Sequence, residues 1–251
     1  LEGVRAHPYA LGYHGRWMIE ADAMAEAPRN TRAVLVVSPN NPTGSYMSEA
    51  ELATIADLCR KRQWALIVDE VFADYPLDVA EPMTDVATRA NVLTFTLAGL
   101  SKTVGLPQMK LGWMIVGGPA RERDAALSAL ELVADTYLSV STPVQVATGT
   151  LLVTGAAVRD AIRHRTRRNL ELLRAEVGRH PACELLPVEG GWSAVVRVPA
   201  TRTEIGSRSA ASSATSATWA PRASGWACSS SAMPAVTASS AARWSRGWRC
   251  V

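Results

Sequence analysis

Four short apolar runs constrain the fold of this 251-residue chain most strongly. Each is rich in Val, Ile, Leu or aromatic residues and stops at glycine, proline or a polar residue, which is typical of a buried strand that leads into a loop. The runs are 32–37, 64–68, 92–97 and 111–116. Strands that are apolar throughout belong to parallel sheets with both faces covered, so the runs predict an α/β fold with a mostly parallel sheet and flanking helices.

One helix is marked clearly between the first two runs. Ser48 followed by Glu51 has the spacing of a capping box, in which each side chain satisfies a backbone N–H of the other residue. Beyond it, apolar residues recur at helical spacing at Leu52, Ile55 and Cys59. We therefore expect a helix that begins directly after Ser48.

The pattern changes after Gly118. Helical periodicity appears around Leu130 and again over 156–177, where the basic run 163–168 is expected to be a solvated helix face. A strand-like stretch over 185–198 follows, interrupted by two glycines. This succession predicts a large α/β domain, a connecting helical segment and part of a smaller α+β domain, over 1–118, 119–154 and 155–204 respectively.

The last 47 residues, 205–251, have a different composition. They contain 12 Ser, 12 Ala, four of the eight Trp and no acidic residue. With almost no Leu, Ile, Val or Phe, this tail buries too little apolar surface to offset the entropy of ordering it, so we expect low-complexity disorder. It also holds five of the 26 basic residues, and without them acidic residues slightly outnumber basic ones. The formal charge of +3 therefore gives no reason to expect a nucleic-acid partner.

Membrane, secretory and metal-binding classes are not favoured either. No run approaches the roughly 18 apolar residues that span a bilayer, and the first residues do not resemble a signal peptide, so we expect a cytoplasmic protein without a membrane partner. The four cysteines are far apart and form no C-x-x-C pair, and the four histidines form no ligand pair at helical spacing. No metal site is expected.

Three polar residues follow the first three predicted strands. They are Asn41, Asp69 and Lys102. In open α/β sheets, ligands bind beyond the carboxyl ends of the strands, so these side chains are expected to lie close together at a binding site.

Lysine usage singles out Lys102 within this group. The chain has 23 Arg but three Lys, at positions 61, 102 and 110. Arginine stays protonated, whereas a partly desolvated lysine can lose its proton and attack a carbonyl group. Lys102 is therefore the best candidate nucleophile.

Four motifs in a fixed order carry a resemblance to a known family. They are SPNNPTG at 38–44, DEVFADY at 69–75, LSKTVGLP at 100–107 and KLGW at 110–113. Together they resemble the class I/II aminotransferases, which are fold-type-I pyridoxal phosphate enzymes, and the resemblance covers residues 1–204. It implies that 1–118 is an incomplete large domain that binds pyridoxal 5'-phosphate.

The resemblance assigns roles to individual residues. Lys102 matches the lysine that holds the cofactor covalently and then moves a proton at the substrate α-carbon. Asp69 matches the carboxylate beside the pyridine nitrogen, and Asn41 the amide that donates to the 3'-oxygen of the ring. Ser101 and Lys110 fall at phosphate-binding positions, where Lys110 replaces a common arginine.

Two positions depart from the family pattern. Phe72 stands where many members have a tyrosine that also reaches the 3'-oxygen, so one hydrogen bond is expected to be missing. Gly99 stands where a phosphate-binding Ser or Thr is common.

The resemblance implies transfer of an amino group from an amino acid to a 2-oxo acid, in a homodimer. A pyridoxal phosphate lyase of the same fold remains an alternative, as does an aminotransferase-like ligand-sensing domain of a transcription regulator. The family's upstream glycine-rich phosphate loop has no counterpart in the sequence, and neither Arg222 nor Arg243 matches the arginine that binds the substrate carboxylate. We therefore expect weak cofactor binding, little or no turnover and poor solubility.

Overall fold

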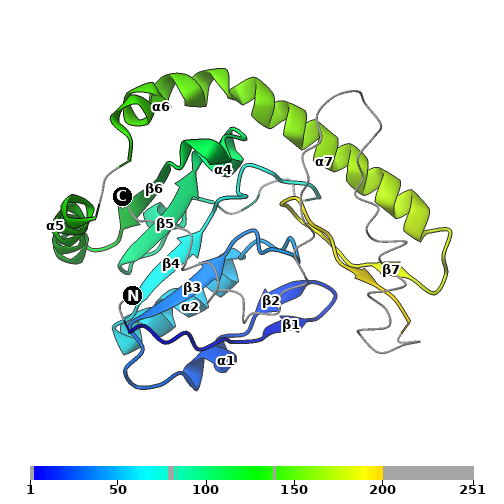
Figure 1. Cartoon of the computed structure of the whole chain (residues 1–251). Helices are drawn as coiled ribbons and strands as arrows, with labels where there is room; N and C mark the ends of the chain where they lie inside the picture. Colours follow the sequence, from blue (N-terminus) through cyan, green and yellow to red (C-terminus); the bar gives the residue numbers. More distant parts are fainter. Residues whose placement is uncertain (1–2, 79–81, 83, 138–139, 200–251) are drawn as a thin grey trace.

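The computed structural model describes residues 3–78, 82, 84–137 and 140–199, and at its centre lies a four-stranded sheet (Figure 1). The strand order is β3-β4-β5-β6, with β3, β4 and β5 parallel and β6 antiparallel to β5. The strands are β3 (Ala33–Val37), β4 (Ala65–Asp69), β5 (Thr94–Gly99) and β6 (Gly112–Gly117). Each begins and ends within two residues of a predicted run, and the predicted α/β fold class with a mostly parallel sheet is confirmed.

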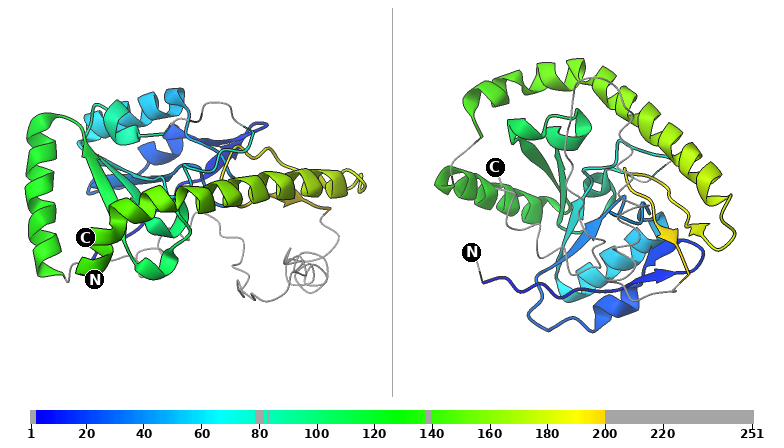
Figure 2. Two further views of the ribbon diagram at one scale, coloured as in Figure 1. Left: turned by 90° about the horizontal axis from the view of Figure 1, so that it is seen from above. Right: turned by 45° about the vertical axis from the view of Figure 1, so that its right-hand side comes forward.

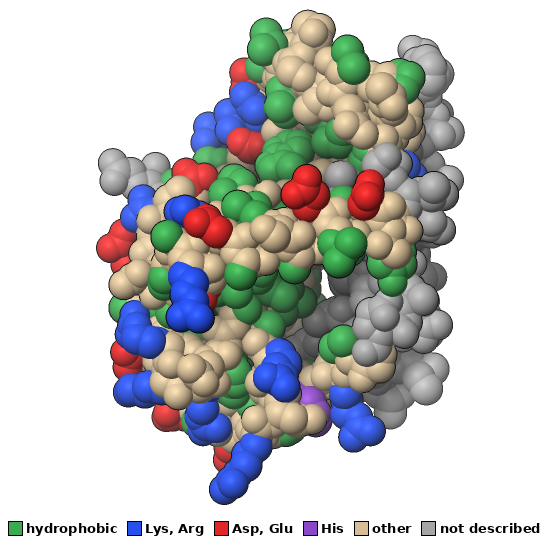
Figure 3. Space-filling view, turned by 90° about the vertical axis from the view of Figure 1, so that its left-hand side faces the viewer, with side chains coloured by type: hydrophobic (Ala, Val, Ile, Leu, Met, Phe, Trp, Pro, Cys, Tyr) green, Lys and Arg blue, Asp and Glu red, His purple; other side chains and the backbone are tan. Residues whose placement is uncertain are grey.

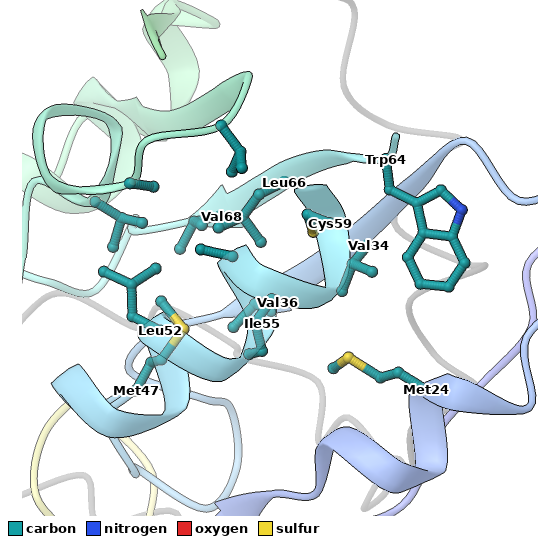
Figure 4. Packing of buried hydrophobic residues seen from close by; sticks show 14 residues of the cluster. Met24, Val34, Val36, Met47, Leu52, Ile55, Cys59, Trp64, Leu66 and Val68 are labelled. Carbon is teal, nitrogen blue, oxygen red and sulfur yellow. The ribbon is translucent and has the colours of Figure 1, made fainter. Parts of the chain in front are cut away.

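Helix α2 (Glu49–Arg62) covers one face of this sheet (Figure 4). Its buried residues Leu52, Ile55 and Cys59 belong to one apolar cluster with alternate residues of β3 and β4. Each buried Leu or Ile contributes about 1.5–3 kcal/mol relative to an exposed one. On the opposite face of the sheet, Leu35 remains 37 % exposed. Both faces were expected to be covered, but within the described residues the cover is complete only on the face that packs against α2.

The predicted capping box at the start of α2 is present. The Ser48 hydroxyl accepts from the Glu51 backbone N–H (3.2 Å), and the Glu51 carboxylate accepts from the Ser48 backbone N–H (2.7 Å). The same buried carboxylate also accepts from the Ile19 backbone N–H (2.7 Å) and from Arg16 (3.3 Å). Glu51 therefore ties the helix to the hairpin of β1 (Leu11–Tyr13) and β2 (Trp17–Ile19).

Replacing Glu51 by glutamine is expected to lower the free energy of unfolding at neutral pH by about 1–3 kcal/mol, because the buried hydrogen bonds lose their charged acceptor. Burial alone would raise the pKa of Glu51, but hydrogen bonds from Ser48 and the Ile19 amide, with the charge of Arg16, hold that pKa below its ordinary value. A carboxyl group with a lowered pKa stabilises the folded state above the unfolded pKa of about 4.3 and loses this contribution in acid.

Urea unfolding at neutral and acid pH measures both effects. Between neutral and acid pH, the free energy of unfolding of the variant should fall less than that of the wild-type protein. The matched control is Glu49→Gln, because Glu49 lies on the same helix with its side chain 77 % exposed and should change little. Equal destabilisation by the two substitutions would contradict this role of Glu51.

The remaining elements surround the sheet. In Figure 1, α6 and α7 form an arch from the β6 side of the sheet to the β7–β8 pair, and Figure 2 shows the length of α7 from two further directions. None of the described helices is long and apolar enough to cross a membrane. The remaining elements are α1 (Ala21–Ala25), α3 (Val86–Arg89), α4 (Leu100–Thr103), the 3-10 helix η1 (Pro107–Met109), α5 (Ala120–Thr136), α6 (Thr142–Thr154), α7 (Ala156–Val177), β7 (Glu184–Leu185) and β8 (Val196–Arg197).

Two expectations for the second half need correction. The strand expected over 185–198 is reduced to two strands of two residues each, because residues 189–191 form hydrogen bonds with the loops after β3 and β4 instead. Most of the basic run is exposed as predicted, but Arg163 donates to the Asp74 carbonyl (2.5 Å). That part of α7 therefore holds the loop after β4. The domain boundaries stay a prediction, and the tail 205–251 lies outside the described residues.

Candidate active site

The carboxyl ends of three strands meet at one edge of the sheet. The Ser38 N–H donates to the Asp69 carbonyl (3.0 Å), and the Glu70 N–H donates to the Leu97 carbonyl (2.9 Å). Asp69 is the last residue of β4, and Lys102 lies in the short α4 that directly follows β5. The topology thus places the loop that carries Asn41 and the two charged residues at the same edge.

Lys102 is half-buried among aromatic side chains. Its amine lies 5.3 Å from the ring centroid of Phe72 and 4.8 Å from that of Trp192. Burial lowers the pKa of Lys102, and the nearby carboxylate of Asp69 opposes this shift only in part. At a given pH, the uncharged, nucleophilic form is therefore a larger fraction of the Lys102 amine than of the amine of an exposed lysine.

The backbone around Lys102 is held from two sides. The Tyr75 hydroxyl donates a short hydrogen bond to the Lys102 carbonyl, and burial raises the pKa of Tyr75 to about 12, so this hydroxyl stays protonated. On the other side, a Cβ at Gly99 would lie 3.0 Å from the Leu111 carbonyl oxygen. The close approach of β6 accounts for glycine at position 99.

Asp69 lies close enough to Lys102 for the charges of the two side chains to interact. Its carboxylate accepts a hydrogen bond from the Val71 N–H (3.0 Å). Burial raises the pKa of Asp69, while this N–H and the charge of Lys102 act in the opposite direction. A carboxylate in such a place gains most from a cationic partner, which would restore its ordinary ionisation.

The structure brings together most of the residues predicted for the site. Asn41 and Phe72 line one hollow with Trp192, and Phe72 in turn contacts the Lys102 amine. Lys110 behaves differently: it is exposed after η1, and within the described part of the chain no ion pair or hydrogen bond joins its side chain to the other candidates.

The hydroxyl of Ser101 is buried without a hydrogen-bond partner among the described residues. Leaving a buried polar group unpaired costs about 1–3 kcal/mol, so such a group in a native fold calls for an acceptor from outside the chain. This is the position at which the resemblance implies a phosphate contact.

Trp192 was not among the residues predicted from the sequence to form the site. It is 40 % exposed and packs edge-on against Phe72 (5.3 Å between centroids) and Tyr75 (5.1 Å). The one signal in the sequence is that an aromatic residue directly follows Gly190 and Gly191.

The family profile described as "Aminotransferase class I and II" matches residues 1–214. The chain belongs to this family. A curated family member, glutamate-pyruvate aminotransferase AlaA of Escherichia coli K12, is 31 % identical over 153 residues, which are 61 % of this chain and 38 % of that protein. Alanine aminotransferase of Mycobacterium tuberculosis H37Rv is 30 % identical over 125 residues, which are 50 % of this chain and 29 % of that protein.

The solved structures show the same fold. Alanine aminotransferase from Pyrococcus furiosus superposes with a TM-score of 0.68 at 18 % identity, over 78 % of this chain and 50 % of that one. An Escherichia coli aminotransferase gives a TM-score of 0.61 at 24 % identity, over 71 % and 45 %. The chain therefore spans half or less of the length of the relatives that it matches.

The side chains at this edge fit the cofactor of the class I and II aminotransferases, which is pyridoxal 5'-phosphate. An aldehyde needs an uncharged amine, a pyridinium needs a carboxylate, and a phosphate needs hydrogen-bond donors. Lys102, Asp69 and the unpartnered hydroxyl of Ser101 supply one group of each kind.

Proposed function

We propose that the protein is a pyridoxal phosphate-dependent aminotransferase that moves an amino group from an amino acid to a 2-oxo acid. One observation carries the proposal: a partly desolvated lysine amine, a half-buried carboxylate and an orphaned serine hydroxyl lie at the carboxyl ends of two neighbouring strands. Family membership supports the same reaction class.

Pyridoxal phosphate, when bound, would supply an aldehyde for the amino group and a ring that withdraws electrons from the substrate α-carbon. Lys102 would hold this group and then take and return the proton at the α-carbon. Asp69 would keep a proton on the pyridine nitrogen, and Asn41 would donate to the 3'-oxygen. Ser101 would donate a hydrogen bond to the phosphate group. Lys110 would add a positive charge on the solvent side of that phosphate.

Substrates with short carbon chains are the first to test. The Escherichia coli relative is named for glutamate and pyruvate and the Mycobacterium tuberculosis relative for alanine, and we propose the same class for this chain. Phe72, in place of the common tyrosine, removes one donor to the 3'-oxygen but leaves the amine, carboxylate and amide in place.

The test is a half-reaction with cofactor-loaded protein and L-glutamate or L-alanine. Slow conversion of the cofactor to its amine form, with release of the matching 2-oxo acid, is the expected result, in keeping with the weak cofactor binding expected from the sequence. With L-serine, pyruvate and ammonia without conversion of the cofactor would identify a lyase and refute the transaminase proposal.

We further propose that the protein acts in the cytoplasm as a homodimer, as members of this family usually do. Exposed apolar side chains on α5 and α6 support the existence of such an interface: Leu132 is 69 % exposed and Val146 80 % exposed. Figure 3, which views the side of the molecule where α5 lies, shows hydrophobic side chains at the surface between the charged ones. Covering them would remove unfavourable contact with water.

The dimer is tested by light scattering coupled to size-exclusion chromatography. We expect the mass of two chains for the wild-type protein and of one chain for the Leu132→Asp variant. A wild-type protein that elutes with the mass of one chain would contradict the proposal.

A further inference from the structure

A segment far along the chain crosses the candidate site. This strap (residues 188–192) contacts the loops after both β3 and β4. The N–H groups of Glu189 and Gly190 donate to the Gly44 carbonyl (3.1 and 2.8 Å), and the Gly191 N–H donates to the Tyr75 carbonyl (2.9 Å). The strap is thus joined by its backbone to the loops that follow Asn41 and Asp69.

Glycine is required where the strap and the first loop meet. A Cβ at Gly44, which has φ of 72°, would lie 2.3 Å from a methyl carbon of Val188. A Cβ at Gly190 would lie 2.5 Å from the ring of Tyr46. Both distances are shorter than real Cβ contacts, so neither position has room for a side chain in this arrangement.

An ion pair anchors the strap from outside. The Glu189 carboxylate accepts from Arg16 at Nε (2.8 Å) and Nη2 (3.1 Å), and also from the Tyr46 N–H (2.8 Å). Arg16 therefore contacts Glu189 with the two-pronged geometry that fixes orientation as well as distance. The same guanidinium donates to the Tyr46 carbonyl (2.7 Å), so the backbone of Tyr46 forms a hydrogen bond with each residue of the ion pair.

The anchored strap determines where Trp192 lies. Its indole ring rests on Phe72 and Tyr75, and the Lys102 amine lies 4.8 Å from the centre of that ring. The ring of Phe72 lies 5.3 Å from the amine and 5.3 Å from the ring of Trp192, so the amine rests against two adjacent aromatic rings. Aromatic faces exclude water from the amine while limiting the directions in which it can point.

We propose that Trp192 is a positioning residue for Lys102, fixed by the Arg16–Glu189 ion pair, and that its ring keeps the amine out of bulk water. The inference rests on the proposed function in one respect, namely that Lys102 is the reacting amine. Two effects of the ring oppose each other, since its face attracts an ammonium ion while its bulk removes water from it. Because burial is the larger influence on the pKa of Lys102, loss of the ring should favour the charged amine.

Competitive acetylation of the protein without cofactor tests the proposal. Traces of acetic anhydride are added across the alkaline pH range, and peptide mapping gives the labelling rate of each lysine. Lys61, exposed on α2, is an internal reference in the same sample. The variants are Trp192→Ala, Trp192→Phe as the conservative replacement, and Glu189→Gln, which weakens the anchor without touching the ring.

In Trp192→Ala we expect the midpoint of the Lys102 profile to move to higher pH and its limiting rate to rise at least about threefold, because water and reagent reach the amine. Trp192→Phe should restore the wild-type profile in large part. Glu189→Gln should shift Lys102 in the same direction as Trp192→Ala but less, with Lys61 unchanged throughout.

A Lys102 profile that stays unchanged or moves to lower pH in Trp192→Ala would overturn the proposal. If that variant fails to fold by circular dichroism, an unshifted profile in the folded Glu189→Gln variant would overturn it equally. The readout needs no cofactor, so this inference can be refuted independently of the proposed function. Wild-type turnover together with unshifted profiles would refute this inference alone.

Discussion

Replacing Lys102 by alanine is expected to slow the half-reaction with L-glutamate at least about 10³-fold, because one side chain supplies both the covalent anchor and the proton-transfer group. Lys102→Arg should fail equally, since a guanidinium keeps the charge but cannot bond to an aldehyde. Stopped-flow absorbance of the cofactor measures the rate directly.

Lys61→Ala is the matched control for this substitution. Lys61 is an exposed lysine on α2, where it pairs with Asp57 on the adjacent turn, so its loss should leave the half-reaction unchanged. A Lys102→Ala variant that retains a rate within about tenfold of the wild-type protein would show that another group performs the proton transfer.

The second large effect is expected at Asp69. Asp69→Asn should slow the half-reaction about 10²–10³-fold, while cofactor still attaches to Lys102, because an amide cannot keep the pyridine nitrogen protonated. Binding and chemistry are measured separately, by equilibrium titration with pyridoxal phosphate and by single-turnover rates. Asp57→Asn, at an exposed position, is the control and should alter neither.

The pH dependence gives a further check on Asp69. Burial raises its pKa above the ordinary aspartate value, so its charge is lost earlier as the pH falls. In the protein without cofactor, the carboxyl group of Asp69 should therefore titrate at higher pH than exposed aspartates, and NMR titration of the side-chain carboxyl groups measures this. Bound pyridoxal phosphate should move this titration to lower pH, because the pyridinium charge favours the carboxylate. A cofactor-free protein in which Asp69 titrates like an exposed aspartate would contradict this expectation.

The sheet was predictable from the sequence because its strands are apolar throughout. Val36 and Leu66, for example, lie in the core between the sheet and α2, and each belongs to an apolar run that indicates a buried strand. The start of α2 was predictable for a different reason, since Ser48 and Glu51 satisfy each other locally. In both cases the pattern of neighbouring residues is enough to predict the element.

Elements that depend on distant contacts were missed. Helix α6 lies inside the helical segment expected over 119–154, but its own bounds were not predicted, because apolar residues on all its sides leave no helical stripe. The stretch 185–198 has a strand pattern, but Glu189 and its neighbours bind the loops after β3 and β4 instead. No local sequence pattern indicates a hydrogen-bond partner more than a hundred residues away.

The candidate site divides in the same way. Asn41, Asp69 and Lys102 could be placed together because parallel strands bring their carboxyl ends to one edge. Trp192 could not, because its place depends on the ion pair of Glu189 with Arg16, 173 positions apart in the sequence. The sequence also says nothing of the unpartnered hydroxyl of Ser101, which becomes visible only when burial is known.

The most direct test of the central claim is to find which lysine carries the cofactor. The wild-type protein is mixed with pyridoxal phosphate, reduced with borohydride and digested, and the modified peptide is identified by mass spectrometry. The account predicts a single modified residue, Lys102, among the three lysines of the chain. Modification of Lys61 or Lys110 with Lys102 left free, or no modified lysine at all, would contradict it.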